Sequence, residues 1–310
     1  MVATSRSGWV SDRDFSGAAV TSRIRLPAAY RISRPDQVLL ILVVYAVGCA
    51  AGAGGEVTVD WGSLLDDAVF VGLVIAVVTV SVHAVNEYAD AETDALTVRT
   101  RFSGGSGALI DHGLPAGFAL RIAVGAAAVA VTLGWVGWTS GRIAGVVLTM
   151  LVLMLVGGWT YSVGPWAFSR HGWGEVANAL LGGLLLPVTG ALVVGAPLGT
   201  ALAAFGPFTL LVFVNLLETQ WADRVADRAV GKNTLASRLS PDSIRLLGGA
   251  AAVAAYVLAL VSQPLQVALA GLFAAPVSAY GVRRLGRGDP GPSVVAMIVL
   301  LFSQGAAWLA

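Results

Sequence analysis

The chain has 310 residues, of which 56% are apolar, 38 are glycine and only 12% carry a charge. A soluble domain carries about twice that share of charged residues. The net charge of +1 gives no field that would attract nucleic acid, and the single cysteine, Cys49, excludes an internal disulfide. The composition therefore excludes a soluble enzyme, a disordered chain and a disulfide-rich secreted protein, and it predicts a protein that crosses the membrane several times.

Apolar stretches of about 16–20 residues recur along the whole sequence, and each is close to the length that crosses a bilayer as a helix. Helices are expected because lipid offers no hydrogen-bond partner to an open strand edge. Many of the stretches are rich in Ala and Gly, which allow helices to pack closely. The sequence predicts nine spans, which cover residues 38–53, 68–85, 122–138, 143–161, 176–194, 202–217, 246–261, 265–280 and 294–309.

The basic residues are distributed unevenly between the two sides of the membrane. Eighteen of the 19 fall before the first span or after the second, fourth, sixth and eighth spans, and only Arg142 falls on the other side. The positive-inside rule assigns the basic side to the cytoplasm. We therefore expect an integral protein of the cytoplasmic membrane with its N-terminus in the cytoplasm and its C-terminus outside. It divides into a cytoplasmic segment, 1–33, and a transmembrane domain, 34–310.

The second span runs directly into a polar cluster that contains Asn86, Asp90 and Asp94. Their spacing of four residues places all three along one face of a helix. Like charges at this spacing repel each other, and the repulsion grows when they are buried. A divalent cation removes that repulsion, and carboxylates are hard oxygen ligands suited to Mg²⁺. The cluster is therefore a candidate magnesium site.

A second acidic pair, Asp223 and Asp227, follows the sixth span, and it lies 133 residues after Asp90 and Asp94, respectively. Both clusters fall at the cytoplasmic end of an even-numbered span. We therefore predict an all-α membrane protein whose nine transmembrane helices surround a central cavity open to the cytoplasmic side. Basic residues are interleaved with the two clusters and are candidates to bind diphosphate: Arg99, Arg101, Arg228 and Lys232.

Two pairs of carboxylates with several cations nearby suit a complex of Mg²⁺ with a diphosphate. The predicted metal ligands are Asp90, Asp94, Asp223 and Asp227, and Asn86 completes the catalytic set. An alternative is that either cluster consists of solvated loop charges that form salt bridges. The matched spacing of the two clusters on one side favours the metal site.

These two motifs resemble those of the UbiA superfamily of intramembrane prenyltransferases. NEYADAETD at 86–94 is similar to the family's N-D-x-x-D-x-x-x-D, and DRVADRAVGKNTL at 223–235 is similar to its D-x-x-x-D followed by G-K-x-T-L. The resemblance runs from about residue 30 to the C-terminus and includes the number of spans. Further matches are Arg34-Pro35, TYSVGP at 160–165 and Gly174-Glu175.

The resemblance implies an enzyme that binds an isoprenyl diphosphate through Mg²⁺ and transfers its prenyl group to an aromatic or quinone-precursor acceptor inside the membrane. The expected partners are that diphosphate, a small lipophilic or aromatic acceptor and membrane lipids, without nucleic acid.

Two departures from the family's pattern stand out. Glu87 replaces an Asp, and Thr219 occupies a position where many members have an acid or Asn, while Glu218 points about 100° away.

Four further residues are candidates to contact the acceptor or to stabilise a carbocation. The aromatic faces of Tyr88 and Tyr161 can stabilise a cation, although Tyr161 also suits the membrane interface. Arg34 can bind an acidic acceptor, as its family position suggests, or mark the membrane boundary. His83 can accept a proton from the acceptor or form a hydrogen bond with a neighbouring helix.

Two other functions fit parts of the sequence. A membrane terpene cyclase would use the same ionisation site without an acceptor, and some superfamily members resemble such enzymes. A cation-coupled transporter would use the acidic pairs to bind ions. The clustering of the acids at one surface rather than at the bilayer midplane disfavours the transporter.

Overall fold

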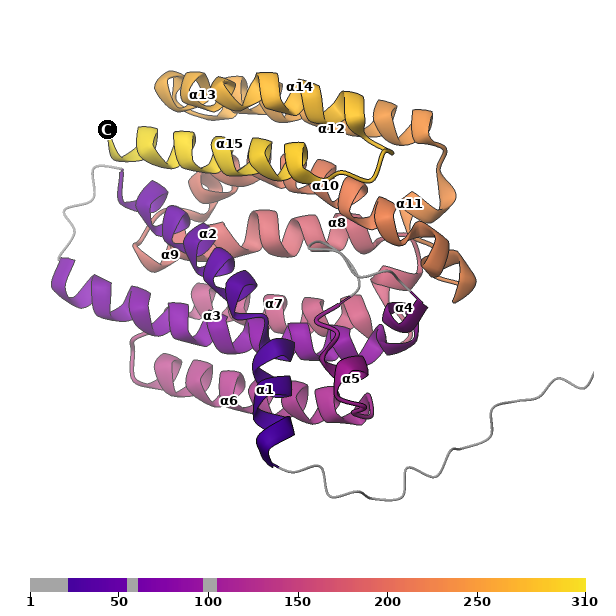
Figure 1. The fold of residues 1–310 in the computed structure, drawn as a ribbon. Helices are drawn as coiled ribbons and strands as arrows, with labels where there is room; N and C mark the ends of the chain where they lie inside the picture. Colours follow the sequence, from indigo (N-terminus) through magenta and orange to yellow (C-terminus); the bar gives the residue numbers. More distant parts are fainter. Residues whose placement is uncertain (1–21, 55–60, 97–104) are drawn as a thin grey trace, which may run out of the picture.

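The computed structural model describes residues 22–54, 61–96 and 105–310, and in these ranges the ordered elements are helices (Figure 1). Short 3₁₀ turns are η1 and η3, and η2 is a π-helix. The elements are α1 (Ser22–Ser33), α2 (Pro35–Ala53), α3 (Trp61–Ala89), α4 (Ala91–Leu96), α5 (Ala108–Asp111), α6 (Gly117–Thr139), α7 (Gly145–Ser162), η1 (Phe168–Arg170), α8 (Gly174–Asn178), η2 (Ala179–Leu185), α9 (Leu186–Val193), α10 (Leu198–Ala229), α11 (Leu235–Arg238), α12 (Pro241–Ser262), α13 (Leu265–Gly271), η3 (Leu272–Ala274), α14 (Ala275–Arg284) and α15 (Gly291–Leu309).

Within the described ranges, nine helical segments are long and apolar enough to cross a membrane. Each corresponds to one of the nine predicted spans, so the predicted fold class is confirmed. The side on which a cavity opens stays a prediction. The segments are Ile24–Ala53, Leu65–Ala89, Gly117–Thr139, Gly145–Ser162, Gly174–Val193, Leu198–Ala229, Pro241–Ser262, Leu265–Arg284 and Gly291–Leu309.

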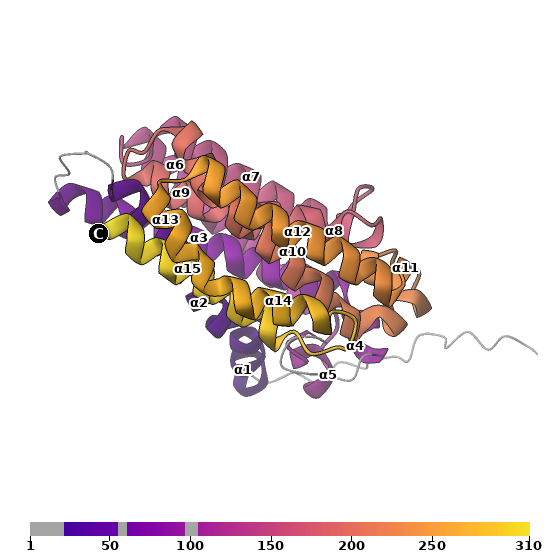
Figure 2. The same ribbon diagram turned by 90° about the horizontal axis from the view of Figure 1, so that it is seen from above.

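Several helices are longer than their apolar spans, and the added turns carry the polar residues. The helix α3 continues to Ala89, past the predicted span 68–85, and α10 continues to Ala229, past the predicted span 202–217. The helix α1 lies within the predicted N-terminal segment and packs against α3 and α5. Figures 1 and 2 both place α4, α5 and α11 at one end of the bundle and the C-terminus at the other. We call the first of these the acidic end.

Small residues bring α2 and α9 close together, as the Ala- and Gly-rich composition of the spans allows. A β-carbon added to Gly48 would lie 2.1 Å from the carbonyl oxygen of Pro187, and one added to Gly190 would lie 2.3 Å from that of Tyr45. Neither position can accept a side chain unless the two helices separate. Such close contact compensates for the absence of a hydrophobic driving force between helices in lipid.

Polar groups in the apolar part of the bundle have partners on neighbouring helices. Pro207 lies inside α10 and has no N–H to offer to the carbonyl of Ala203. The hydroxyl of Ser262 lies 3.2 Å from that carbonyl and 2.7 Å from the carbonyl of Leu258 in its own helix. The amide of Gln304 donates a hydrogen bond to Gln263 at 2.7 Å, so α15 and the end of α12 are joined.

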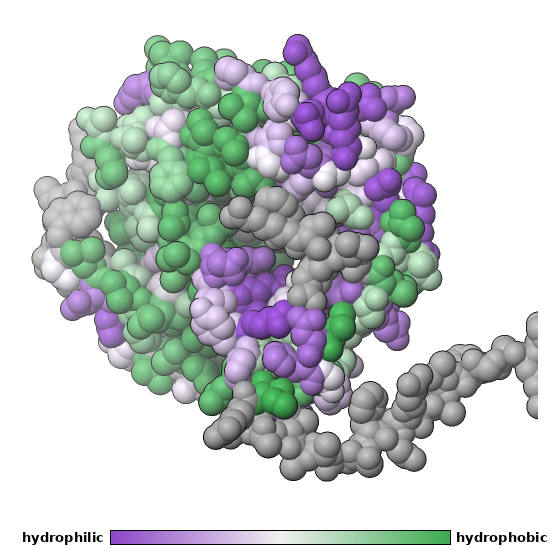
Figure 3. Space-filling view, viewed as in Figure 1, coloured by the Kyte–Doolittle hydropathy of each residue, from purple (hydrophilic) through white to green (hydrophobic). Residues whose placement is uncertain are grey.

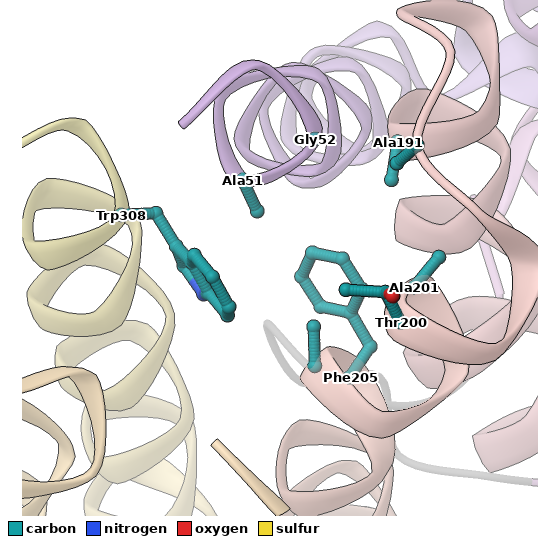
Figure 4. Close-up of a pocket in the computed structure, with 9 residues that line it drawn as sticks. Ala51, Gly52, Ala191, Thr200, Ala201, Phe205 and Trp308 are labelled. Atoms are coloured by element: carbon teal, nitrogen blue, oxygen red, sulfur yellow. The ribbon is translucent and has the colours of Figure 1, made fainter. Parts of the chain in front are cut away.

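The surface divides between apolar sides and a polar end. Figure 3 shows hydrophobic residues over much of the face in view and hydrophilic residues gathered near α4 and α5. At the opposite end, a small apolar pocket lies between α2, α9, α10 and α15, with Trp308 and Phe205 on opposite sides of it (Figure 4). Ala51, Gly52 and Ala201 also line this pocket.

Candidate active site

The first acidic cluster continues the helical path of α3 into α4. The backbone N–H of Asp90 donates to the carbonyl of Asn86 at 2.9 Å, and that of Asp94 donates to the carbonyl of Asp90 at 2.8 Å. These bonds keep the helical register, so the predicted alignment of the three residues is correct. The side-chain amide of Asn86 donates a further hydrogen bond to Asp90 Oδ2 at 3.1 Å.

The second cluster lies in the last turns of α10. Asp223 and Asp227 both belong to the helix, and the chain then turns back at Gly231, whose φ of +74° favours glycine. The turn is closed by the backbone N–H of Lys232, which donates to the carbonyl of Asp227 at 2.8 Å. The Lys232 side chain is therefore directed back over the helix end, and it is buried.

Lys232 joins the two acidic clusters. Its ammonium lies 2.6 Å from Asp90 Oδ1 and 3.9 Å from Asp227 Oδ1. Asp90 comes from the end of α3 and Asp227 from the end of α10, so acids from two helices share one cation. The predicted meeting of the two clusters at one end of the bundle is thus observed in the structure.

A buried glutamate supports the turn that carries Lys232. Glu175, in α8, is fully buried, and its Oε1 accepts a hydrogen bond from the backbone N–H of Leu235 at 2.6 Å. The hydroxyl of Thr234 lies 3.3 Å from Asp227 Oδ2 and also accepts from the N–H of Ser237, which caps α11. The sequence motif G-K-x-T-L therefore acts as one structural unit with Asp227.

Glu87 holds a second group of residues beside the first cluster. Its Oε1 accepts a hydrogen bond from the Arg34 guanidinium at 2.6 Å and another from the backbone N–H of Ser106. Its Oε2 accepts from the Ser106 hydroxyl at 2.9 Å. Glu87 is buried, so this carboxylate links the junction of α1 and α2 to the segment before α5.

Asp94 has too little positive charge around it. Burial and the negative charges of Asp90 and Glu87 raise its pKa to about 7, against the smaller opposing effects of Arg34 and Lys232. A carboxyl whose ionised form is disfavoured in this way is a good position for a bound cation, because the cation would supply the missing charge.

The residues at the acidic end fit magnesium. In the described part of the chain, no group of three or more His, Cys, Asp and Glu side chains is arranged to hold a metal ion by itself. Magnesium commonly takes only one or two protein carboxylates and completes its shell with water and substrate phosphates. The two aspartate pairs, each with hard oxygen donors, match that pattern. Asp94 belongs to the pair at the end of α3 and in α4, and Asp227 belongs to the pair at the end of α10.

Other predicted residues lie around this centre. Tyr161, near the end of α7, is within electrostatic reach of Asp90 and Asp227. The ring of His83 lies 3.2 Å from the carbonyl of Ser33, at the end of α1. His83 thus contacts a neighbouring helix, as one of the two interpretations of the sequence predicted. Its role toward an acceptor stays a prediction.

Some predicted residues are less directly engaged. Tyr88 is 37% exposed, and the Nε of Arg228 donates to the carbonyl of Ser237 at 2.6 Å. Their proposed contacts with substrate stay predictions. Arg99 and Arg101 lie outside the described residues.

One buried glutamate of α10 serves the fold instead of the acidic centre. Glu218 accepts hydrogen bonds from the backbone N–H groups of Gly286, Gly288 and Asp289, at 3.0, 2.9 and 3.1 Å. It thereby fixes the loop between α14 and α15. The helical geometry had already separated Glu218 from Asp223 and Asp227, but its partner could not be read from the sequence, because the loop is distant along the chain.

The fold and this centre define an integral membrane protein with an acidic site at one end of a helical bundle. The sequence profile of the UbiA prenyltransferase family matches residues 39–304. The chain belongs to the UbiA prenyltransferase family, and it is a prenyltransferase in that general sense. The comparison with curated proteins gives no match.

Several solved structures have a similar fold. A UbiA homolog from Archaeoglobus fulgidus bound to DMAPP and Mg²⁺ has a TM-score of 0.65 and 17% identity, over 91% of this chain and 98% of that chain. The homolog bound to GPP and Mg²⁺ gives 0.64 and 17%, over 91% and 100%. A structure of digeranylgeranylglyceryl phosphate synthase gives 0.64 and 13%, over 92% and 99%. At these identities the similarity concerns the fold.

Proposed function

We propose that the protein transfers a prenyl group from an isoprenyl diphosphate to an aromatic or quinone-precursor acceptor within the membrane, with Mg²⁺ as cofactor. The observation that carries this proposal is the ion pairing of Lys232 with Asp90 and Asp227, which brings two acidic helix ends to one point. Family membership and the Mg²⁺ and isoprenyl diphosphates named for the similar structures support it.

In this proposal Asp90 and Asp94 form one magnesium position and Asp223 and Asp227 form the other. Bound Mg²⁺ supplies positive charge to the diphosphate as negative charge develops on it. Lys232 already points into the same space and contributes a cation from the protein. Arg99, Arg101 and Arg228 are the remaining candidates for the diphosphate oxygens.

The chain's own residues then position the substrate and exclude water. Asn86 orients Asp90 through its hydrogen bond, and Tyr161 offers an aromatic face close to the acids. The bond between prenyl C1 and the diphosphate oxygen breaks, and its electron pair leaves with the diphosphate. A new bond forms between C1 and an oxygen or ring carbon of the acceptor, whose displaced proton passes to the released diphosphate. An apolar bundle protects the allylic cation from hydrolysis.

The arrangement in the membrane follows from the same proposal. Residues 34–310 form the catalytic domain in the cytoplasmic membrane, with the acidic end and the N-terminus on the cytoplasmic side and the C-terminus outside. A cysteine placed near the C-terminus in a Cys49→Ala background would then react with an impermeant thiol reagent in cells whose outer envelope has been removed. Reaction only after the membrane is broken would reverse this orientation.

The activity is tested by diphosphate release from the purified protein in detergent. Release is expected to require Mg²⁺, geranyl diphosphate and an acceptor. Asp90→Asn and Asp227→Asn should each lower the turnover about 100-fold or more. Asp242→Asn, at an exposed aspartate paired with Arg245, is the matched control and should retain full turnover.

Two outcomes would contradict the proposal. Normal turnover in Asp90→Asn or Asp227→Asn, with the variant folded, would remove these residues from the active site. Release without an acceptor, together with a cyclic hydrocarbon or alcohol as the main product, would identify a terpene cyclase.

A further inference from the structure

A group of arginines lies where α12 begins and α14 ends. These two helices run side by side in opposite directions: the Nε of Arg245 donates to the carbonyl of Leu285 at 3.3 Å, and the hydroxyl of Tyr256 lies 2.6 Å from that of Ser278. Figure 3 shows hydrophilic residues at this place, in the upper right of the view. We call these residues the arginine group, which consists of Arg245, Arg283, Arg284 and Arg287.

Two members of the arginine group have acidic partners. Arg245 lies 3.2 Å from Asp242, and Arg284 lies 3.4 Å from Asp289. The side chains of the two aspartates are 89% and 52% exposed. Ion pairs exposed to this degree contribute little to stability, so they compete weakly with a more strongly charged anion.

The other two members, Arg283 and Arg287, carry charge that the protein does not balance. Both are exposed, and neither forms an ion pair within the described ranges of the chain. Because the arginine group has four cations and two acidic partners, two positive charges are in excess at this place. An anion from outside the protein can supply the missing negative charge.

The arginine group lies at the boundary of the apolar spans. The predicted spans begin at residue 246 in α12 and end at residue 280 in α14, so these cations fall just outside the apolar stretches. That is the depth at which the headgroups of membrane lipids lie. The group is thus placed to meet a lipid phosphate.

An exposed apolar surface continues from the arginine group along the same two helices. Leu246, Val253 and Val257 recur at helical spacing in α12 and are 76%, 65% and 53% exposed. In α14, Ala279 lies one turn before Arg283, and both residues are exposed. The two helices therefore present apolar side chains to the lipid next to exposed cations.

We propose that this surface binds an anionic phospholipid, with its phosphate at Arg245, Arg283 and Arg287 and an acyl chain along Leu246 and Val253. A guanidinium matches the geometry of a phosphate and binds it through two parallel hydrogen bonds. The positive-inside rule accounts for the side of the membrane on which the arginines lie, but it does not require a bound lipid. Unbalanced arginines directly above an apolar surface favour an anionic lipid over a zwitterionic one.

The bound lipid would also act on the helix that carries the second acidic pair. The loop that contains Arg287 is held by Glu218 of α10, which accepts hydrogen bonds from the N–H groups of Gly286 and Gly288. A ligand that binds the folded protein stabilises it by mass action. The lipid should therefore raise the melting temperature. This inference is independent of the proposed prenyl transfer, because the arginine group lies outside the acidic centre.

The test measures lipid binding to the full chain by native mass spectrometry after delipidation in detergent. Dioleoyl phosphatidylglycerol is expected to bind at least about tenfold more tightly than dioleoyl phosphatidylcholine and to raise the melting temperature. Equal binding of the two lipids would overturn the inference. Inorganic phosphate is added in a third sample. An equal rise in melting temperature with phosphate alone would identify an ion site and overturn the assignment to a lipid.

A pair of double variants locates the binding surface. Arg283→Gln with Arg287→Gln should lower the affinity for phosphatidylglycerol at least about tenfold and leave that for phosphatidylcholine unchanged. The matched control is Arg25→Gln with Arg121→Gln, which removes the same charge from exposed positions in α1 and α6. It should leave both affinities unchanged. Equal losses in the two double variants would show that the net charge attracts the lipid and that this surface does not.

Each variant is first checked for folding by size-exclusion chromatography in detergent. Should the double variant not fold, Arg287→Gln alone is expected to lower the affinity for phosphatidylglycerol by a smaller factor, and an unchanged affinity would contradict the proposal. The apolar part of the surface is tested with dihexanoyl phosphatidylglycerol, which should bind more weakly than the dioleoyl lipid. Equal affinity for the two would contradict the position assigned to the acyl chain.

Discussion

Glu175 and Leu235 are joined by a hydrogen bond of 2.6 Å from the backbone N–H of Leu235 to the buried carboxylate. This bond connects α8 to the start of α11 and so fixes the turn that contains Lys232 and Thr234. Both of these residues contact acids of the proposed active site. A residue outside both aspartate pairs thus supports the geometry of the site.

Removal of this bond should weaken both the fold and substrate binding. Glu175→Ala leaves the N–H of Leu235 without its acceptor, which costs about 1–3 kcal/mol. We expect a lower melting temperature in detergent and a higher KM for the isoprenyl diphosphate, because Lys232 is held less firmly. Glu175→Gln retains an acceptor oxygen and should keep most of the stability. Equal losses in the two variants would assign the effect to the charge of Glu175 and not to the hydrogen bond.

Lys232 should contribute most to the stability of the fold when no metal is bound. Lys232→Met removes the cation between Asp90 and Asp227, and breaking a buried ion pair costs roughly 3–5 kcal/mol. The variant should melt at a lower temperature in a chelator and gain more stability from added Mg²⁺ than the unmodified protein does. Arg283→Met, at an exposed arginine, is the control. A Lys232→Met variant as stable as the unmodified protein in chelator would contradict this prediction.

The pKa of Asp94, about 7, predicts that metal binding depends on pH. The carboxyl holds a proton below that pH, and the proton must leave before a cation binds, so the affinity for Mg²⁺ should fall about tenfold per pH unit below pH 7 and level off above it. Binding of Mn²⁺, followed by electron paramagnetic resonance across this range, measures the slope. Asp94→Asn should abolish it, and an unchanged slope would assign the proton to another group.

The same pKa predicts the opposite trend for stability without metal. The folded-state pKa lies above the ordinary value of 3.8, so the folded protein binds the proton more tightly than the unfolded chain does. The free energy of unfolding should therefore decrease as the pH rises from about 4 to about 7. Thermal unfolding in chelator across this range, compared with Asp94→Asn, isolates the contribution of this carboxyl.

The close contact of α2 with α9 predicts a strong effect of one methyl group. In Gly48→Ala the new β-carbon would lie 2.1 Å from the Pro187 carbonyl oxygen, so the helices must separate and the melting temperature should fall by several degrees. Gly125→Ala, in α6, is the control because nothing lies within 4 Å of its added β-carbon. That variant should be neutral or slightly stabilised. A similar result for both would show that α2 and α9 can adjust.

The parts of the fold that repeat along the chain could be predicted from the sequence. Length and apolarity alone located all nine spans, because each helix must cross the same thickness of lipid. Local spacing also placed Asn86, Asp90 and Asp94 on one helical path. The helical angle separated Glu218 from Asp223 and Asp227, as observed.

Contacts between distant segments could not be predicted in the same way. Arg34 forms its ion pair with Glu87 from a left-handed position between α1 and α2, and the identity of an arginine does not indicate that conformation. Likewise, the partner of Glu175 is the first residue of α11, 60 residues later in the chain and beyond one further membrane span. Such pairs depend on how the helices pack against each other, and no periodic pattern in the local sequence predicts them.

Lys232 gives the acidic end its own counter-ion. Because this ammonium is part of the polypeptide, the helix ends that carry Asp90 and Asp227 can come together during biogenesis before any metal arrives. The newly inserted protein can thus be fully assembled in the membrane but inactive until metal binds. Its dependence on magnesium would then belong to each round of turnover, and a cell short of this ion would lose the activity while keeping the protein.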